Sequence, residues 1–253
     1  MASQLEEAVR TYRARLAAAS WVGFDLDDTL HEFRSASSTA SKAVFATISQ
    51  RHGVPMTKLQ DQYTVILWEL TSHAFCDGRT SHDYRRERLV ALLEAFSLPI
   101  ESEFIQELLT LYESALKASL RLKPGAASLL QRLASLGKKI VVVTEGPQDA
   151  QEWMIAHLGI ASYVHCLVTT NRFGATKTTG LFGLVLKHLD IDQGEIVYIG
   201  DNLERDVKAA AGEGILPIHL ADKQGSWTGD GPFWAKELAE IENLLEAGGC
   251  VEV

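Results

Sequence analysis

The chain has 253 residues, of which 46% are hydrophobic and 23% charged, and its formal net charge at pH 7 is −9. This composition predicts a folded, soluble protein with one large core, or a core and a smaller second unit. The negative charge argues against binding to a nucleic-acid polymer and against attraction to an anionic membrane, because both need a basic surface. A site for an anionic ligand must therefore carry its positive charge locally.

The three cysteines, Cys76, Cys166 and Cys250, are far apart and fit neither a disulfide framework nor a zinc site with paired ligands. No apolar run approaches the length of a membrane span, and the first twenty residues contain no signal-peptide core. We therefore predict a cytoplasmic protein, and the sequence does not decide between a monomer and a homodimer.

The first twenty residues carry apolar side chains at helical spacing and predict a short amphipathic helix. Short apolar runs then predict five buried parallel strands, at 21–24, 140–143, 164–168, 196–199 and 215–220. Between strands lie two helical stretches, at 126–136 and 150–158, each followed by a glycine that can end a helix. A last helix is predicted at 233–245. This alternation predicts an α/β fold with a doubly wound, Rossmann-like parallel sheet, whose ligands bind at the carboxyl ends of the strands.

Residues 32–116 break the alternation, because they have helical periodicity and no clear strand. We predict an all-helical insert there, which leaves residues 1–31 and 117–253 as a discontinuous core. The insert follows the first strand and ends before Lys123-Pro124-Gly125, so both its ends return to the same edge of the sheet. A lid would be hinged at this place.

Carboxylates follow two of the predicted strands. Asp25 and Asp27 come directly after 21–24, and Asp201 and Asp206 come after 196–199. If these strands are neighbours, the carboxylates share a small volume and raise one another's pKa unless a cation compensates. Oxygen ligands favour a hard ion such as Mg²⁺. A single aspartate at such a place is more often a turn or cap residue, but two clusters at two strand ends favour a metal site.

Two further strand ends offer groups that suit an anion. Thr144, Glu145 and Gly146 follow 140–143 and supply a hydroxyl and backbone N–H donors at the start of a helix. Lys177 stands in the loop after 164–168, where a lone lysine is usually a solvated surface charge. Neither feature decides the chemistry by itself.

The order of these features resembles the haloacid dehalogenase superfamily of hydrolases. Asp-x-Asp-x-Thr, a strand-end Thr, a loop Lys and Gly-Asp-x-x-x-x-Asp are all present in register between 21 and 220, and the insert is similar to that superfamily's helical cap. The resemblance implies a Mg²⁺-dependent phosphatase for a small-molecule phosphate ester.

The resemblance also implies the role of each residue. Asp25 is the implied nucleophile, which forms an aspartyl phosphate, and Asp27 protonates the leaving oxygen and then activates water. Thr144 and Lys177 hold the phosphoryl oxygens, and the loop at Glu145 and Gly146 belongs to the same substrate site. The implied Mg²⁺ ligands are the Asp25 carboxylate, the Asp27 main-chain carbonyl, Asp201 and Asp206, the last directly or through water.

Two alternatives within the superfamily remain, a dehalogenase and a phosphomutase. Dehalogenases of the superfamily lack an aspartate at the position of Asp27, whereas phosphatases have it. Asp28-Thr29 is also more similar to phosphatases than to phosphomutases, which often have Gly-Val there. Glu145 stands where relatives often have Asn, and Thr178 where Pro is common, which bears on substrate placement more than on activity. A non-catalytic regulatory protein that binds a phosphate ligand is a third alternative.

The insert gathers four arginines within ten residues of an otherwise acidic chain, at 79, 85, 86 and 88. Since arginine suits carboxylate and phosphate groups, we predict that Arg85 or Arg88 contacts an anionic substrate. The alternative is a solvated face on which Arg85, Arg86 and Arg88 pair with Asp83 and Glu87. The sequence does not identify the ester.

Overall fold

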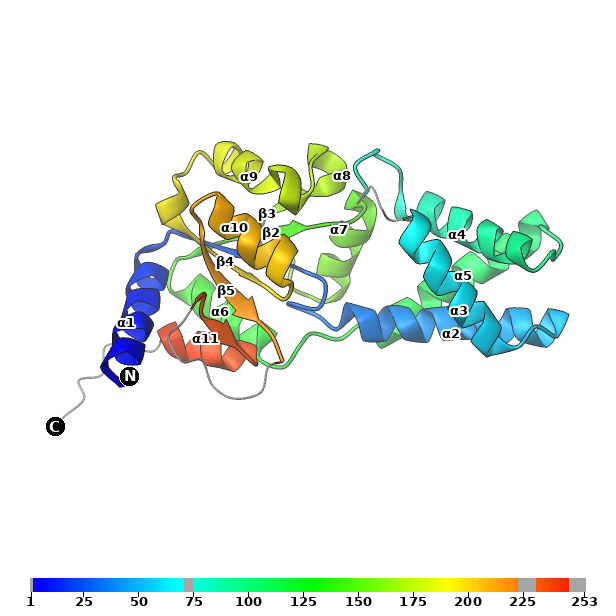
Figure 1. Cartoon of the computed structure of the whole chain (residues 1–253), viewed down its shortest axis with the longest axis horizontal. Helices are drawn as coiled ribbons and strands as arrows, with labels where there is room; N and C mark the ends of the chain where they lie inside the picture. Colours follow the sequence, from blue (N-terminus) through cyan, green and yellow to red (C-terminus); the bar gives the residue numbers. More distant parts are fainter. Residues whose placement is uncertain (1, 71–74, 223–230, 246–253) are drawn as a thin grey trace.

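The computed structural model describes residues 2–70, 75–222 and 231–245, with side chains from residue 6 onward. It consists of a parallel sheet covered by helices and, beyond one end of the sheet, a group of helices formed by the insert (Figure 1). The predicted α/β fold is confirmed. Within the described ranges, no helix is both long and apolar enough to cross a membrane.

The described residues form a six-stranded parallel sheet in the order β3-β2-β1-β4-β5-β6. The strands are β1 (Trp21–Phe24), β2 (Lys139–Thr144), β3 (Val164–Thr169), β4 (Ile196–Gly200), β5 (Leu216–Leu220) and β6 (Trp234–Ala235). β1 lies in the middle, and Phe24 is in register with both Val142 of β2 and Ile199 of β4. The residues that follow β1, β2 and β4 therefore meet at one edge of the sheet.

Side chains alternate along each strand between two buried clusters. One cluster joins Phe24 and Val142 to helices α1 (Ala2–Ala18), α6 (Ala126–Ser135) and α11 (Leu238–Leu245). The other joins Val141 and Tyr198 to α9 (Leu181–Leu189) and α10 (Ala209–Gly212). Helices thus cover both faces of the sheet, as Figure 1 shows, and the doubly wound arrangement is confirmed.

Shorter helices occupy the connections near the strand ends. They are α7 (Gln148–His157), α8 (Thr170–Phe173), two 3₁₀ turns at Lys177–Thr179 and Gln193–Glu195, and a π-helix at Leu203–Lys208.

The predicted helix at 233–245 is only partly correct, because it begins at Leu238. Trp234–Ala235 instead form β6, and the His219 N–H donates a hydrogen bond of 2.8 Å to the Phe233 carbonyl. A strand of two residues has no periodicity that a sequence could display. The open edge of β5 supplies the hydrogen bonds that make it a strand.

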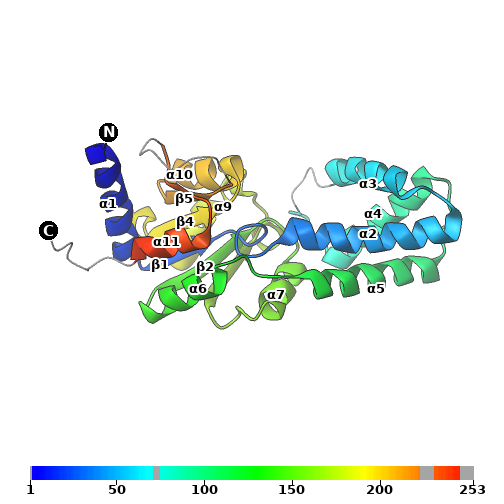
Figure 2. The same cartoon turned by 90° about the horizontal axis from the view of Figure 1, so that it is seen from below.

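The insert contains α2 (Phe33–His52), α3 (Met56–Leu70), α4 (Ser81–Ala95) and α5 (Ser102–Ser119), with no strand in its described residues. The predicted boundary at 116 lies inside α5, which continues to Ser119. The long helices α2 and α5 lie side by side and extend away from the sheet (Figure 2).

The two segments that join the insert to the sheet also run together. The Glu32 N–H donates to the Arg121 carbonyl at 3.0 Å, and the Lys123 N–H donates to the Leu30 carbonyl at 2.9 Å. Both ends of the insert therefore lie beside the residues that follow β1.

Candidate active site

Asp25 lies directly beyond β1 and is 5% exposed. Its Oδ1 accepts a hydrogen bond of 2.5 Å from Lys177 Nζ, and its Oδ2 accepts one of 3.1 Å from the Thr29 hydroxyl. Thr29 is fully buried. Both carboxylate oxygens are thus fixed in direction before any ligand binds, and the threonine of the Asp-x-Asp-x-Thr motif has a visible positioning role.

Lys177 is 4% exposed, which differs from the usual solvated lysine of a loop. Its Nζ donates to Asp206 Oδ1 at 2.6 Å as well as to Asp25. Burial alone would lower the lysine pKa, but the two carboxylates outweigh it and raise the pKa of Lys177 above its ordinary value. The ammonium group therefore stays charged.

The carboxylates of Asp25, Asp201 and Asp206 converge, and one oxygen of each lies within 4.8 Å of the others. Burial, together with the charges of Asp206 and Asp27, raises the pKa of Asp25 well above its ordinary value despite Lys177. Burial and Asp206 likewise raise the pKa of Asp201, although Arg34 opposes this shift. Buried carboxylates in excess of cations suit a hard divalent ion, so the residues present fit Mg²⁺.

Asp206 is 1% exposed, and both its oxygens are engaged. Oδ1 accepts from Lys177 and from the Tyr198 hydroxyl at 3.1 Å, and Oδ2 accepts from the Asn202 N–H at 2.9 Å. A Cβ on Gly200 would lie 2.4 Å from Asp206 Cγ, so only glycine permits this approach. Asp206 is consequently a rigid support for Lys177.

The Asp27 carboxylate contacts a residue that the sequence analysis missed. Asp27 Oδ1 lies 2.9 Å from His31 Nε2, and the His31 ring is fully buried with no hydrogen-bond partner for Nδ1 among the described residues. A buried histidine ring therefore holds the Asp27 carboxyl group in one direction. Asp27 and His31 are four residues apart in the sequence, a spacing that brings side chains together in a helix. The residues between them form a turn instead, so the spacing did not predict this contact.

Thr144 ends β2 and is 1% exposed, and its hydroxyl donates to Gln151 Oε1 at 3.2 Å. Glu145 Oε1 accepts from the Lys177 N–H at 2.9 Å, and Glu145 Oε2 pairs with Arg205 at 3.1 Å. Glu145, which departs from the pattern of the resembling proteins, thus anchors the loop that carries Lys177. Gly146 lies between these groups and Gln151, where a Cβ would come within 2.5 Å of the Gln151 side chain.

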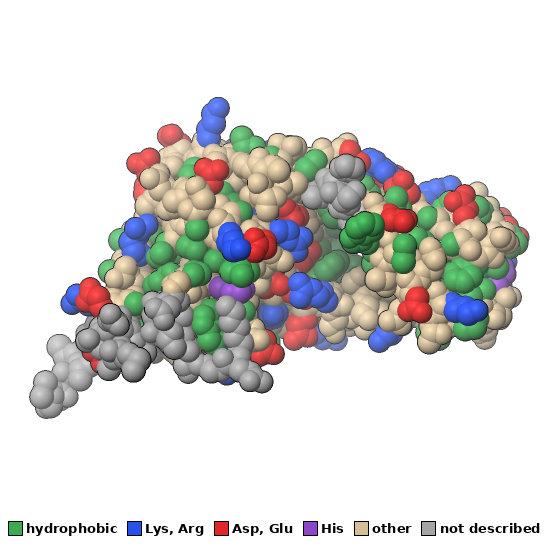
Figure 3. Space-filling model, viewed as in Figure 1, with side chains coloured by type: hydrophobic (Ala, Val, Ile, Leu, Met, Phe, Trp, Pro, Cys, Tyr) green, Lys and Arg blue, Asp and Glu red, His purple; other side chains and the backbone are tan. Residues whose placement is uncertain are grey.

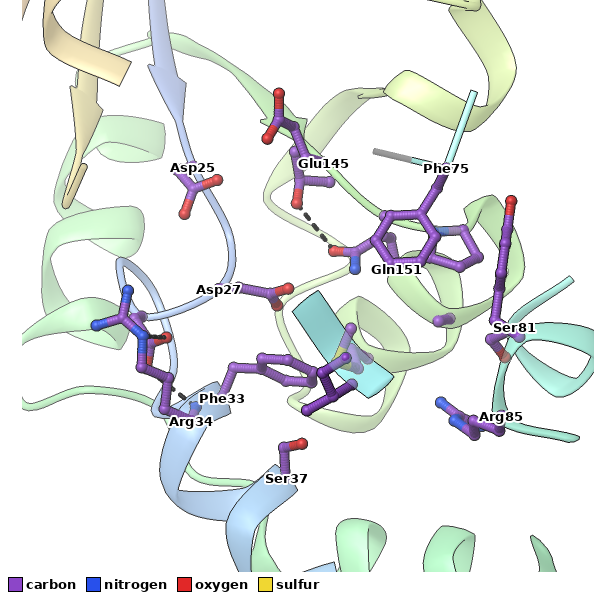
Figure 4. A pocket seen from close by; sticks show the side chains of 18 of the residues that line it. Asp25, Asp27, Phe33, Arg34, Ser37, Phe75, Ser81, Arg85, Glu145 and Gln151 are labelled. Carbon is purple, nitrogen blue, oxygen red and sulfur yellow. Dashed lines mark hydrogen bonds and ion pairs between the residues drawn. The ribbon is translucent and has the colours of Figure 1, made fainter. Parts of the chain in front are cut away.

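A cavity of about 410 Å³ opens between the strand ends and the insert. The sheet side supplies the predicted residues Asp25, Asp27, Thr144, Glu145, Gly146, Lys177, Asp201 and Asp206, and the insert supplies Phe33, Tyr63, Phe75, Tyr84, Arg85, Arg88 and Tyr112. Figure 3 shows the molecule hollowed between the two parts, with acidic and basic side chains near the hollow. Figure 4 shows Asp25 and Asp27 on one side and Arg85 on the other. The fold therefore brings every predicted site residue to one cavity.

Contacts between insert and core close one side of this cavity. At the start of α4, the Ser81 hydroxyl donates to Asp149 Oδ2 at 2.7 Å, and the Ser81 N–H donates to Asp149 Oδ1 at 3.0 Å. The Asn171 side chain donates to the carbonyls of Phe75 and Arg79, at 3.2 and 3.1 Å. The insert is thus held against the carboxyl ends of the strands.

In the described part of the chain, neither Asp83 nor Glu87 forms an ion pair with Arg85, Arg86 or Arg88. Asp83 forms the capping box of α4 with Thr80, and Glu87 pairs with Arg79 at 2.8 Å. Arg85 pairs instead with Glu113 of α5 at 3.3 Å.

The comparison with known families decides the identity of the fold. The model for haloacid dehalogenase-like hydrolases matches residues 20–214, which is more than half of the chain. The chain belongs to the haloacid dehalogenase-like hydrolases. The resemblance inferred from the four motifs is confirmed.

Two curated relatives of this haloacid dehalogenase-like hydrolase are named as phosphatases. A glyceraldehyde 3-phosphate phosphatase from Pyrococcus abyssi is 27% identical over 77% of this chain and 78% of that protein. A ribulose-1,5-bisphosphate 5-phosphatase from Halopiger xanaduensis is 31% identical, over 42% of this chain and 45% of that protein.

Solved structures share the fold of this haloacid dehalogenase-like hydrolase. A HAD phosphatase from Thermococcus onnurineus covers 90% of this chain and 98% of its own length, with a TM-score of 0.64 and 22% identity. A 2-haloacid dehalogenase from Pseudomonas syringae has the same coverage, a TM-score of 0.65 and 23% identity. Phosphatases and dehalogenases match equally well, so these likenesses establish the fold alone.

The raised pKa values of Asp25 and Asp201 predict how metal and pH act on stability. A group whose pKa is raised by folding stabilises the protein at low pH and loses that contribution as pH rises through the folded pKa. Added Mg²⁺ should offset this loss of stability at neutral pH, whereas in acid protons should compete with Mg²⁺ for the carboxylates. We expect Mg²⁺ to raise Tm by several degrees near pH 7.5 and by far less near pH 5, measured against EDTA by differential scanning fluorimetry. An equal rise at both pH values would contradict the assignment.

Proposed function

We propose that the protein is a Mg²⁺-dependent phosphatase that hydrolyses a small-molecule phosphate monoester through an aspartyl phosphate on Asp25. The observation that carries the proposal is the buried Asp25 carboxylate, fixed by Lys177 and Thr29 at the floor of the cavity. A buried carboxylate held in one direction beside a cation is suited to attack a phosphorus atom in line. The names of the curated relatives support the same reaction class.

The reaction divides into two displacements. In the first, an Asp25 oxygen bonds to phosphorus while the bond from phosphorus to the ester oxygen breaks, and Asp27 gives its proton to the leaving alcohol. In the second, Asp27 takes a proton from water as the water oxygen attacks the same phosphorus, which releases phosphate and restores Asp25. Thr144 and Lys177 bind phosphoryl oxygens throughout.

Asp25, the Asp27 main-chain carbonyl and Asp201 are the proposed Mg²⁺ ligands. When bound, the ion would neutralise charge on the phosphoryl oxygens. Since both oxygens of Asp206 already accept hydrogen bonds, we propose that Asp206 acts mainly through Lys177 and reaches the ion indirectly.

We propose that residues 32–116 act as a cap over a core formed by 1–31 and 117–253. The cap supplies the aromatic and basic wall of the cavity, and its two connecting segments run side by side, as a hinge requires. The net negative charge and the scattered cysteines support a small-molecule substrate and a cytoplasmic location.

Phosphate release from a panel of esters, including p-nitrophenyl phosphate, tests the proposal when it is measured with Mg²⁺ and with EDTA. Borohydride reduction during turnover, followed by mass spectrometry, should convert the phosphorylated residue to homoserine at position 25. A dehalogenase would release no phosphate from these esters but would release halide from a 2-haloacid, and a phosphomutase would convert the ester to an isomer. No release from any ester despite Mg²⁺ binding would favour a regulatory role.

The contact between His31 and Asp27 predicts a dependence on the leaving group. His31→Leu removes the donor that holds the proposed proton donor, so alkyl phosphates should lose roughly tenfold more kcat than p-nitrophenyl phosphate, whose leaving group needs no proton. His31→Gln, which keeps an N–H donor, should recover much of the loss. Equal losses for both kinds of ester would mean that His31 has only a structural role.

A further inference from the structure

Arg88 of α4 forms no ion pair with any carboxylate among the described residues. Its Nε and Nη2 atoms are buried and form no hydrogen bond in the described part of the chain. The acidic residues that could serve it are occupied elsewhere, because Glu87 pairs with Arg79 and Glu113 pairs with Arg85. Its guanidinium lies over the Phe75 ring, 5.6 Å from the centroid, and also interacts with the Tyr63 hydroxyl, but neither contact gives Nε or Nη2 an acceptor.

Buried N–H groups that lack both a hydrogen-bond acceptor and a counter-ion are costly, because the loss of their hydration is not compensated; this applies to Nε and Nη2 of Arg88. Arg88 belongs to the cap side of the cavity, whose other side carries the carboxylates that follow the strands. The arrangement is therefore incomplete in the free protein, and an anion that entered the cavity would complete it.

The neighbours of Arg88 are also donors. Arg85 lies over the Tyr112 ring at 5.1 Å, and the Tyr112 hydroxyl lies 3.0 Å from the Ser37 hydroxyl. Burial raises the pKa of Tyr63 to about 12, so this phenol is a neutral hydroxyl at physiological pH. Among the residues that line the cavity, every carboxylate belongs to the strand ends or the turn after β1, and none belongs to the cap.

We propose that the cap end of the cavity, centred on Arg88, binds a second oxyanion of the substrate. The proposal rests on the proposed phosphatase function and defines its substrate class: a phosphate monoester that carries a carboxylate or a second phosphate at its other end. The planar guanidinium matches either group through paired N–H donors. One anionic end lies at Asp25 and Lys177, and the other lies at Arg88.

Matched pairs of esters test this proposal. 3-Phosphoglycerate and glycerol 3-phosphate differ only in a carboxylate that replaces a hydroxymethyl group, and 1,3-propanediol bisphosphate differs from its monophosphate only in the second phosphate. The wild type should favour the doubly anionic member of at least one pair by roughly 10- to 100-fold in kcat/KM, as a charged hydrogen bond would give. The pair that shows the preference identifies the anion.

Arg88→Gln should reduce this preference to within about threefold of unity and leave the singly anionic ester nearly unchanged. Arg88→Lys, which keeps the charge but not the fork, should retain part of it. Arg86→Gln is the matched control, because Arg86 is exposed on the same helix and does not line the cavity. Tm measurements identify any variant that fails to fold, and the lysine variant then carries the test.

Calorimetry on Asp25→Asn protein makes the same comparison without turnover. Adding Arg88→Gln should weaken binding of the doubly anionic ester by at least tenfold and leave the dissociation constant of the singly anionic ester unchanged. Equal affinities for both members of each pair, or equal losses, would overturn the subsite. Mg²⁺-dependent release from p-nitrophenyl phosphate without any such preference would overturn the subsite and leave the phosphatase proposal standing.

Discussion

Asp25→Asn is expected to lower kcat/KM for every ester by roughly 10⁴-fold or more, because the amide cannot form the covalent intermediate. The side chain keeps its shape, so the cavity should be preserved. Since burial raises the pKa of Asp25, removal of its charge should leave Tm unchanged or slightly higher in EDTA. Phosphate release and scanning fluorimetry measure the two effects.

Asp61→Asn is the matched control, since Asp61 is exposed on α3 and distant from the sheet. It should leave both activity and Tm unchanged. If Asp25→Asn retained more than about a tenth of the wild-type rate, another residue would have to be the nucleophile.

Lys177→Met is expected to have the largest effect on stability. The change leaves Asp25 and Asp206 buried without their shared cation. Loss of one partner from a buried ion pair costs about 3–5 kcal/mol, which corresponds to a fall in Tm of roughly 6–20 °C for a chain of this size. Activity should fall with it, because Lys177 also binds the phosphoryl group in the proposed mechanism.

The pH dependence distinguishes this electrostatic effect from a loss of packing. Without Lys177, which lowers the pKa of Asp25, the folded-state pKa of Asp25 rises further, so protonation restores stability as pH falls through it. In EDTA, the Tm difference from wild type should therefore shrink near pH 5 and grow near pH 8. A difference that did not change with pH would point to lost packing of the lysine side chain.

The strands that carry the site could be predicted because parallel strands buried on both faces are continuous apolar runs. β1 matches its predicted range, and each of β2, β3 and β4 is one or two residues longer than its own predicted range. Residues after such strands meet at one sheet edge, so Asp25 and Asp201 could be grouped before any coordinates were known. Family membership then followed from the order of the motifs and is confirmed.

Other features depended on contacts that sequence spacing does not encode. Lys177 occurs in a loop that resembles an ordinary solvated one, but Glu145 accepts the hydrogen bond of its N–H, and its ammonium group pairs with Asp25 and Asp206. His31 contacts Asp27 across an irregular turn, where no helical or strand period applies.

The sequence by itself therefore determined the α/β class, the helical insert and the residues at the strand ends, because local periodicity and strand direction are properties of the chain. Only the tertiary structure decided which arginine has no carboxylate partner among the described residues. Arg85 and Arg88 are alike in sequence, but Glu113 of α5 approaches one and no carboxylate of the described residues pairs with the other. Charge compensation depends on distances between helices far apart in the chain, and these are set by packing of the whole fold.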